Sequence, residues 1–199
     1  MPDTRGLLDH GLLDHGQSCL VVIDVQQYFL DKLPLDWREP LVARIAWLMR
    51  VARILDIPII ATAEDIAHDG PLVAPLMAEL PAETQVFDKK IFGLHDQPNI
   101  RAAVTATGKR HFVLVGLETD VCIAHSALGL QGAGYRVTVI DDATASPPPH
   151  HEFGLARMAA AGIIRTSVKG VYYEWVRDLA THAQVKRQLN APLPPGLTL

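Results

Sequence analysis

Cysteine is scarce in this chain, with only Cys19 and Cys122 among 199 residues. Both lie in apparent strand or helix segments and suggest no disulfide framework, so a reducing, cytoplasmic location is the expectation. The first residues lack the charged and then apolar pattern of a secretory signal. No apolar run approaches the roughly 20 residues that cross a bilayer, so a membrane partner is not expected.

Basic stripes and glycine-rich phosphate loops are also missing. The formal net charge is −4 and no cluster of Lys or Arg stands out, which argues against a nucleic-acid partner. No Gly-x-Gly-x-x-Gly occurs, and Thr107-Gly108-Lys109 resembles a P-loop only at its end, because Ala103 stands where the first glycine is needed. The sequence therefore gives no reason to expect a nucleotide or any other cofactor.

Apolar residues, in contrast, are plentiful. They make up 49% of the chain against 20% charged residues, a composition typical of one well-filled domain. We expect an N-terminal arm over residues 1–16, which contains a tandem GLLDH, a single domain over 17–190, and a Pro-rich tail over 191–199. The apolar fraction and the arm favour a homo-oligomer.

Apolar strand-like runs alternate with segments of helical periodicity. Strands are expected over residues 19–24, 58–62, 84–88, 112–117, 136–141 and 163–167, the last at a sheet edge. Helices are expected over 41–55, 73–80, 99–107, 147–161 and 171–188, with one more beginning near Cys122. This alternation predicts an α/β fold, a three-layer α/β/α sandwich around a mostly parallel, doubly wound sheet.

The stretch from His111 to Ser126, HFVLVGLETDVCIAHS, has the pattern of a buried strand followed by a helix. Gly116 is expected to break the strand, and Thr119-Asp120 to cap the helix. Cys122 then falls in the first helical turn, where unpaired N–H groups and the helix dipole favour a thiolate. An α/β protein would place a nucleophile at this point.

Two further reactive residues follow strands. Asp24 ends the first expected strand and Lys89 ends the third, and the carboxyl ends of parallel strands meet at one edge of a sheet. Taken singly, a cap, a solvated lysine and a small buried thiol are ordinary interpretations of Asp24, Lys89 and Cys122. Together they form a chemical set. Asp24 can accept the thiol proton, Lys89 can hold the charges of the set in place, and Cys122 can attack a carbonyl.

Three segments also make the sequence recognisable. VVIDVQQYF, FDKKIFG, and VLVGLETDVC followed by GYRVTVIDDATAS occur in this order, and the likeness extends from residue 18 to about 178. In these segments the chain resembles the isochorismatase-like cysteine hydrolases, a superfamily that includes nicotinamidases, N-carbamoylsarcosine amidohydrolases and ureidoacrylate amidohydrolases.

The resemblance implies a role for each matched residue. Cys122 becomes the nucleophile and Asp24 the base and later the acid. Lys89 fits the family pattern better than Lys90, because Phe92-Gly93 then follow at the right distance. The resemblance also implies a cis peptide at Leu117–Glu118, with the backbone N–H groups of Glu118 and Cys122 directed at an oxyanion. The implied reaction is cleavage of a small amide or ureido C–N bond through a thioester on Cys122.

The sequence departs from nicotinamidases, which hold a metal with an Asp-x-His and a further His. Here the Asp65-to-His68 spacing is one residue too long, and no second His follows before His95. We therefore expect no metal, with Asp65 and His68 facing solvent or a pocket rim. Phe29 and Phe92, which lie beside the expected triad in sequence, are the preferred candidates for a substrate pocket.

Two alternatives remain open. A vinyl-ether hydrolase of the isochorismate type would depend on protonation by Asp24 and less on Cys122. A catalytically silent homologue would only bind a small molecule or a partner protein, although an intact Asp24, Lys89 and Cys122 set argues against it. The sequence does not identify the small-molecule substrate.

Overall fold

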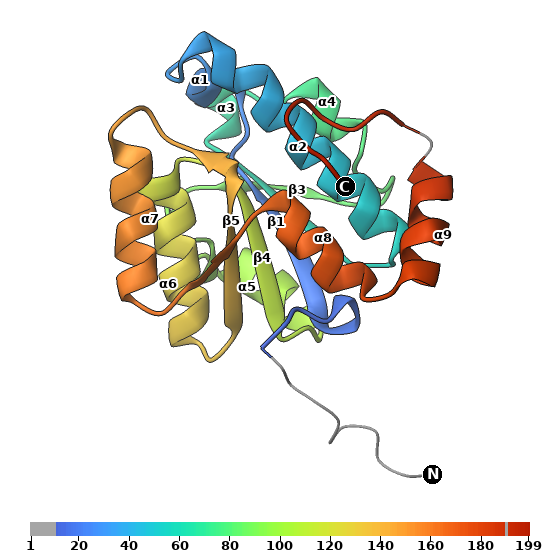
Figure 1. The fold of residues 1–199 in the computed structure, drawn as a ribbon. Helices are drawn as coiled ribbons and strands as arrows, with labels where there is room; N and C mark the ends of the chain where they lie inside the picture. Colours follow the sequence, from blue (N-terminus) through green and yellow to red (C-terminus); the bar gives the residue numbers. More distant parts are fainter. Residues whose placement is uncertain (1–10, 190) are drawn as a thin grey trace.

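The computed structural model describes residues 11–189 and 191–199, and a parallel sheet forms its centre (Figure 1). Its strands are β1 (Ser18–Ile23), β2 (Ile59–Glu64), β3 (Val86–Lys89), β4 (His111–Leu117), β5 (Arg136–Ala145) and β6 (Ile164–Thr166). They form one 6-stranded sheet in the order β3-β2-β1-β4-β5-β6. Every neighbouring pair is parallel, and the order reverses direction beside β1.

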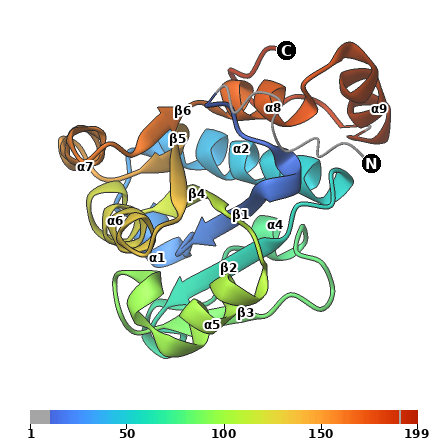
Figure 2. The ribbon, with the colours of Figure 1, turned by 90° about the horizontal axis from the view of Figure 1, so that it is seen from below.

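Helices cover both faces of the sheet (Figure 2). They are α1 (Gln27–Leu30), α2 (Leu35–Ile54), α3 (Ile66–Asp69), α4 (Ala74–Met77), α5 (Pro98–Ala106), α6 (Ala124–Gly132), α7 (His150–Ala160), α8 (Val168–Val176) and α9 (Leu179–Leu189). Short 3-10 turns occur at His15–Gln17 and Leu94–Asp96, and a π-helical turn spans Thr119–Ile123. The predicted three-layer α/β/α architecture is confirmed.

Alternate residues of each central strand point to opposite faces, so the chain has two apolar cores. Leu20 of β1 packs in the core that α2, α8 and α9 cover, together with Trp47 and Tyr172. Val21, the next residue, packs in the core that α5, α6 and α7 cover, together with Met158. The central strands are thus buried on both faces, as their continuous apolar runs predict.

The bounds of several elements differ from the sequence expectation. Helix α2 begins at Leu35 rather than residue 41 and contains Pro40, which lies near the helix start and removes only one intrahelical hydrogen bond. The expected helix over 171–188 is two helices: Arg177 has a positive φ of 62°, and the Asp178 carboxylate accepts the N–H groups of Ala180 and Thr181 at the start of α9.

Strand β4 ends at Leu117, as expected, and Gly116 interrupts its regular pairing without ending it. The sheet register shifts between Leu114 and Gly116, which marks a bulge against β5. Gly116 has φ +122°, and a Cβ there would lie 2.0 Å from the carbonyl oxygen of Ile23 on β1. Only glycine fits this close approach of two backbones.

Both ends of the described chain pack on the α2–α8 side. The first ten residues of the expected arm lie outside the described part, but Leu13 is buried and its N–H donates to Glu174 of α8. In the Pro-rich tail, the Pro195 carbonyl accepts a hydrogen bond from Arg44, and Leu197 packs in the same core. No helix in the described ranges is long and apolar enough to cross a membrane.

Candidate active site

Three of the predicted residues meet at the carboxyl edge of the sheet. Asp24 directly follows β1, Lys89 is the last residue of β3, and Cys122 lies in the turn after β4. The Lys89 ammonium is 3.0 Å from Asp24 Oδ2 and 3.5 Å from Cys122 Sγ. Asp24 and Lys89 are fully buried and Cys122 is 3% exposed. The structure thus brings the expected Asp-Lys-Cys set into one contact group.

Asp24 is fixed by its neighbour on β2. Its N–H donates to the Thr62 carbonyl at 3.0 Å, and the Thr62 hydroxyl donates to Asp24 Oδ1 at 2.7 Å. Its other carboxylate oxygen takes the ion pair with Lys89. Both oxygens of this buried carboxylate therefore have partners, as a charge in an apolar interior requires.

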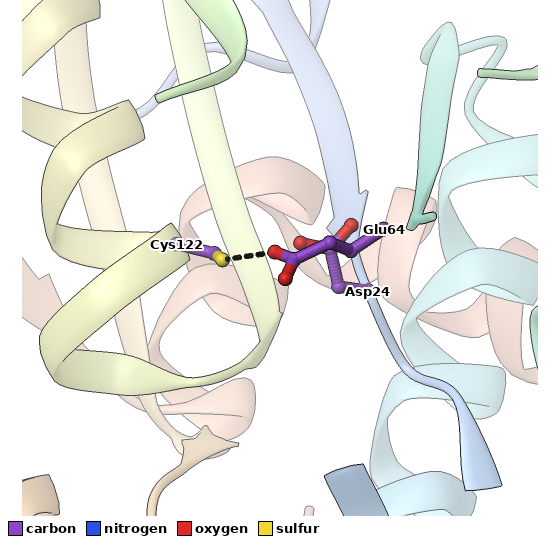
Figure 3. A group of neighbouring side chains, drawn as sticks. All are labelled: Asp24, Glu64 and Cys122. Carbon is purple, nitrogen blue, oxygen red and sulfur yellow. Dashed lines mark hydrogen bonds between the residues drawn. The ribbon is translucent and has the colours of Figure 1, made fainter. Parts of the chain in front are cut away.

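Glu64 is the site residue that the sequence reasoning missed. The Cys122 thiol donates to Glu64 Oε2 at 3.1 Å, and the Lys89 ammonium lies 3.1 Å from the same oxygen. Figure 3 shows the Glu64 carboxylate pointing at the sulfur, and one oxygen of Asp24 lies within 4.8 Å of both groups. Glu64 is the last residue of β2 and the register partner of Lys89 on β3. Strand register, had it been known, would have placed Glu64 here.

The side chains of Asp24, Glu64 and Cys122 carry the kinds of donor atoms that bind metal ions. One carboxylate oxygen each of Asp24 and Glu64 and the Cys122 sulfur lie within 4.8 Å of one another. The Lys89 ammonium, however, contacts all three residues within 3.5 Å, so the lysine supplies the positive charge between these ligands. A metal ion would have to share this space with the ammonium at strong charge repulsion. The residues therefore fit a lysine-neutralised site better than a metal centre.

Burial and charge move the pKa values of all three predicted residues. Burial raises the pKa of Asp24, against the effects of Lys89 and Thr62. Burial alone would lower the pKa of Lys89, but the charges of Asp24 and Cys122 raise it. The pKa of Cys122 is raised by burial, then by the charge of Asp24, against the effect of Lys89.

Burial and the neighbouring carboxylates therefore oppose the thiolate that the helix start was expected to favour. The local helix geometry explains part of the difference. Cys122 lies in a π-helical turn whose N-cap is Glu118, without a side-chain cap. Asp120 accepts a hydrogen bond from Ser146 at 2.7 Å, and Thr119 Oγ1 contacts His151 Nδ1 at 2.8 Å. Neither Thr119 nor Asp120 caps the helix, contrary to expectation.

The structure also places the remaining predicted residues. The peptide between Leu117 and Glu118 is cis, as the resemblance implies. Phe92 is 53% exposed, and its ring centroid lies 5.9 Å from Lys89 Nζ. Phe29 is buried and lies under the ammonium of Lys32, which pairs with Glu118. A pocket role for the two phenylalanines stays a prediction.

Lys90 and His68 lie away from this group. Lys90 is exposed and pairs with Asp65 at 2.6 Å and with Asp88 at 3.2 Å, so Lys89 rather than Lys90 reaches the site. His68 is exposed and contacts Asp69. Asp65 and His68 thus face solvent, one of the two placements expected from their spacing.

A cavity lies away from this group of residues. A cavity of about 540 Å³ opens between α2 and the C-terminal tail, and its lining includes Leu30, Val42, Trp47 and Pro192. None of Asp24, Glu64, Lys89 and Cys122 lines this cavity. Its walls are mainly apolar and offer no nucleophile, so the chemistry belongs to the sheet edge.

Comparison with protein families gives one match that spans most of the chain. The isochorismatase domain model matches residues 18–169, which include Asp24, Glu64, Lys89 and Cys122. Isochorismatase family protein 2A of Dictyostelium discoideum is 30% identical over 180 residues, which cover 82% of this chain and 84% of the relative.

Solved structures give the same result at the level of the fold. YcaC from Pseudomonas aeruginosa, solved with hexane-2,5-diol and covalent acrylamide, superposes with a TM-score of 0.82 at 27% identity and covers 92% of this chain and 91% of its own. YcaC from Escherichia coli, described as an octameric hydrolase of unknown specificity, has a TM-score of 0.78 at 26% identity, with 90% and 91% covered.

Proposed function

Because the chain belongs to the isochorismatase domain family, we propose that it is a cysteine hydrolase that cleaves a small amide or ureido C–N bond without a metal. The hydrolase class is supported by the structural relatives, one of which is described as a hydrolase. The bond type and the cysteine mechanism are our proposal.

One observation supports this reaction above all others. Cys122 is a nearly buried thiol at the carboxyl end of a central strand, with a carboxylate and an ammonium within reach. A structural thiol needs no charged neighbours, and charges are buried only at a cost. A nucleophile that must lose and regain a proton does need them.

The first stage forms a thioester. Asp24 accepts the proton of Cys122 as the sulfur attacks the carbonyl carbon, so that the S–C bond forms and the carbonyl oxygen becomes an oxyanion. The N–H groups of Glu118 and Cys122 are proposed to hold that oxyanion. Asp24 then gives its proton to the departing nitrogen, and the C–N bond breaks. Lys89 keeps Asp24 in place and offsets the negative charge of the sulfur.

The second stage releases the acid. A water molecule loses a proton to Asp24 and attacks the thioester carbonyl. The S–C bond breaks, and the proton returns to the sulfur. A raised pKa suits Asp24 for both stages, because it makes the carboxylate a better base than a solvated aspartate.

The assembly and location are also proposals. An octameric relative supports a homo-oligomer, and large apolar side chains such as Leu35 and Phe153 are exposed on this chain. Phe29 and Phe92 are proposed to line the substrate pocket, and the cytoplasm remains the proposed location.

The test is turnover of small primary amides and ureido compounds by the full chain and by Cys122→Ala, with ammonia release as the readout. Mass spectrometry of a quenched reaction should show an acyl adduct on Cys122 that hydroxylamine removes. Ammonia release that survives in Cys122→Ala would contradict a cysteine nucleophile.

A vinyl-ether hydrolase remains the second candidate. The observation that favours it is the raised pKa of the buried Asp24, which also suits a carboxyl group that donates a proton. In that case Cys122→Ala would keep activity on an isochorismate-type vinyl ether, and Asp24→Asn would lose it. If neither reaction is found and a ligand still binds, the chain is a silent homologue.

A further inference from the structure

Glu64 contacts the nucleophile, yet the proposed reaction assigns it no role. Its Oε2 lies 3.1 Å from Cys122 Sγ and 3.1 Å from Lys89 Nζ. Its side chain is 19% exposed, whereas those of Asp24 and Lys89 are not exposed at all. Glu64 is therefore the more solvent-accessible of the two carboxylates at the sulfur.

The backbone of Glu64 is fixed by a buried amide. The Glu64 N–H donates to Gln26 Oε1 at 2.7 Å, and Gln26 Nε2 donates to the Glu64 carbonyl at 2.7 Å. Gln26 is fully buried, and its Nε2 also donates to the Gly70 carbonyl. A side chain that merely faced solvent would not need this support. These bonds instead fix the backbone position from which the Glu64 carboxylate reaches the sulfur.

Around the thiol, two carboxylates share one ammonium. The Lys89 ammonium lies 3.0 Å from Asp24 and 3.1 Å from Glu64, so this one positive charge serves both side chains. Glu118, the N-cap of the turn that holds Cys122, pairs with Lys32 at 3.6 Å. An acyl group with its own carboxylate beside the scissile bond would thus meet a net negative site.

Glu64 is also placed to accept a hydrogen bond from the scissile amide. When sulfur bonds to the carbonyl carbon, the amide nitrogen is attached to that same carbon, and Glu64 Oε2 is a hydrogen-bond neighbour of the sulfur. An ionised carboxylate is an acceptor only, so it suits an N–H and not an ester or ether oxygen.

We propose that Glu64 determines the substrate class: uncharged acyl groups with a free N–H at the scissile bond, to the exclusion of acyl groups with an adjacent carboxylate. This inference rests on the proposed function, since it assumes that Cys122 is the nucleophile. It also disfavours the vinyl-ether alternative, because an isochorismate-type substrate is anionic and offers no N–H.

Alkylation of Cys122 tests the inference without knowledge of the substrate. Iodoacetamide, iodoacetate and methyl iodoacetate place an amide, a carboxylate and an ester, respectively, next to the carbon that sulfur attacks. The rate of each is measured by mass spectrometry of the Cys122 peptide. Ratios between reagents cancel the thiolate fraction, which the variants also change.

The variants separate charge from hydrogen bonding. Glu64→Gln keeps an acceptor oxygen and loses the charge, and Glu64→Met loses both. Glu79→Gln is the matched control, because Glu79 is a carboxylate that pairs with Arg50 and Arg53 away from the site. Free N-acetylcysteine gives the intrinsic ratio of the reagents.

We expect the iodoacetamide-to-iodoacetate ratio at Cys122 to exceed that of N-acetylcysteine by about tenfold or more, and to fall by about tenfold in Glu64→Gln but not in Glu79→Gln. The iodoacetamide-to-methyl iodoacetate ratio should fall in Glu64→Met. If Cys122 reacts but every ratio equals that of the free thiol, Glu64 selects nothing and the proposed nucleophile stands. If Cys122 reacts with none of the reagents in any variant, the nucleophile proposal fails and the role of Glu64 fails with it.

Discussion

Asp24 and Lys89 form an ion pair of 3.0 Å in which neither side chain is exposed to solvent. The two residues come from strands β1 and β3, between which β2 lies in the sheet. The removal of one partner from such a pair leaves a buried charge without compensation, and that cost exceeds the value of the pair itself. The pair therefore links the stability of the fold to the chemistry of the site.

Lys89→Met should destabilise the chain more than Asp24→Asn does. Without Lys89, two carboxylates remain side by side, so we expect a loss of about 3–5 kcal/mol in the free energy of unfolding. Without Asp24, the Lys89 ammonium still has Glu64 at 3.1 Å, and the loss should be smaller. The double variant should lose less than the sum of the two, as urea denaturation would measure.

The neighbouring surface pair gives the control. Lys90 and Asp65 lie 2.6 Å apart with side chains 52% and 47% exposed. Lys90→Met and Asp65→Asn should each change stability by about 1 kcal/mol or less. Equal effects at Lys89 and Lys90 would contradict the importance of the buried pair.

The pH dependence of Cys122 alkylation should reflect its raised pKa. Burial and the charge of Asp24 disfavour the thiolate, so the iodoacetamide rate of the parent chain should still rise above pH 8.5, near the pKa of about 8.5 of a free thiol. Asp24→Asn and Glu64→Gln each remove a negative charge near the sulfur. Both should therefore move the profile to lower pH, whereas removal of the Lys89 charge should move it to higher pH.

Cys19 should not interfere with this measurement. It is fully buried, and burial raises its pKa to about 12. Cys122→Ala should consequently abolish labelling of the folded chain. A parent profile that levels off well below pH 8.5 would mean that the site stabilises the thiolate after all, as the sequence alone had suggested.

Three of the four charged or nucleophilic residues that meet at this edge of the sheet can be predicted from the sequence to lie there. Asp24, Lys89 and Cys122 each follow a recognisable apolar strand, and parallel topology alone is enough to gather strand ends at one edge. Glu64 was missed because β2 was expected to end at Thr62, two residues early. Its contact with Lys89 depends on the register of β2 and β3, which local sequence does not specify.

The thiol pKa illustrates a second limit. The turn after a strand can be read from Gly116 and the residues that follow, and its helix-start chemistry favours a thiolate. The opposing effects, burial and the charges of Asp24 and Glu64, arise only when distant segments pack around Cys122. Long-range packing and charge, rather than the local pattern, therefore set the direction in which the pKa of Cys122 shifts.

Gly154 of α7 should be essential for the position of the Cys122 turn. A Cβ at Gly154 would lie 2.7 Å from the backbone N and Cα of Asp120. Alanine normally stabilises a helix interior by about 0.5–1 kcal/mol relative to glycine, but here the backbone must move apart. We expect Gly154→Ala to destabilise the chain by about 1–3 kcal/mol and to slow Cys122 alkylation.

Gly129 of α6 is the matched helical control. The nearest atom to a Cβ at Gly129 is His95 Cβ at 3.6 Å, an ordinary contact. Gly129→Ala should therefore stabilise the chain by about 0.5–1 kcal/mol and leave alkylation unchanged. Thermal denaturation of the two variants would compare them directly, and a stabilising Gly154→Ala would show that α7 does not constrain the turn.

Gln26 should affect the thiol although it does not contact it. Gln26→Leu removes the two hydrogen bonds that hold the Glu64 backbone and the one to Gly70, at an expected cost of about 3 kcal/mol in stability. The neighbouring Gln27 is exposed and its side chain donates to Asp31, so Gln27→Leu should cost less than about 0.5 kcal/mol.

The functional reading of Gln26 requires a second measurement, because any buried glutamine would affect stability. If Gln26 positions Glu64 at the sulfur, Gln26→Leu should shift the alkylation profile of Cys122 to lower pH and reduce the iodoacetamide-to-iodoacetate ratio, as Glu64→Gln does. Gln27→Leu should leave both unchanged. A destabilised Gln26→Leu chain with the parent profile and ratio would make Gln26 a structural residue only. The carboxylate would then be held at the sulfur by Lys89 alone, whose ammonium is its other partner at 3.1 Å.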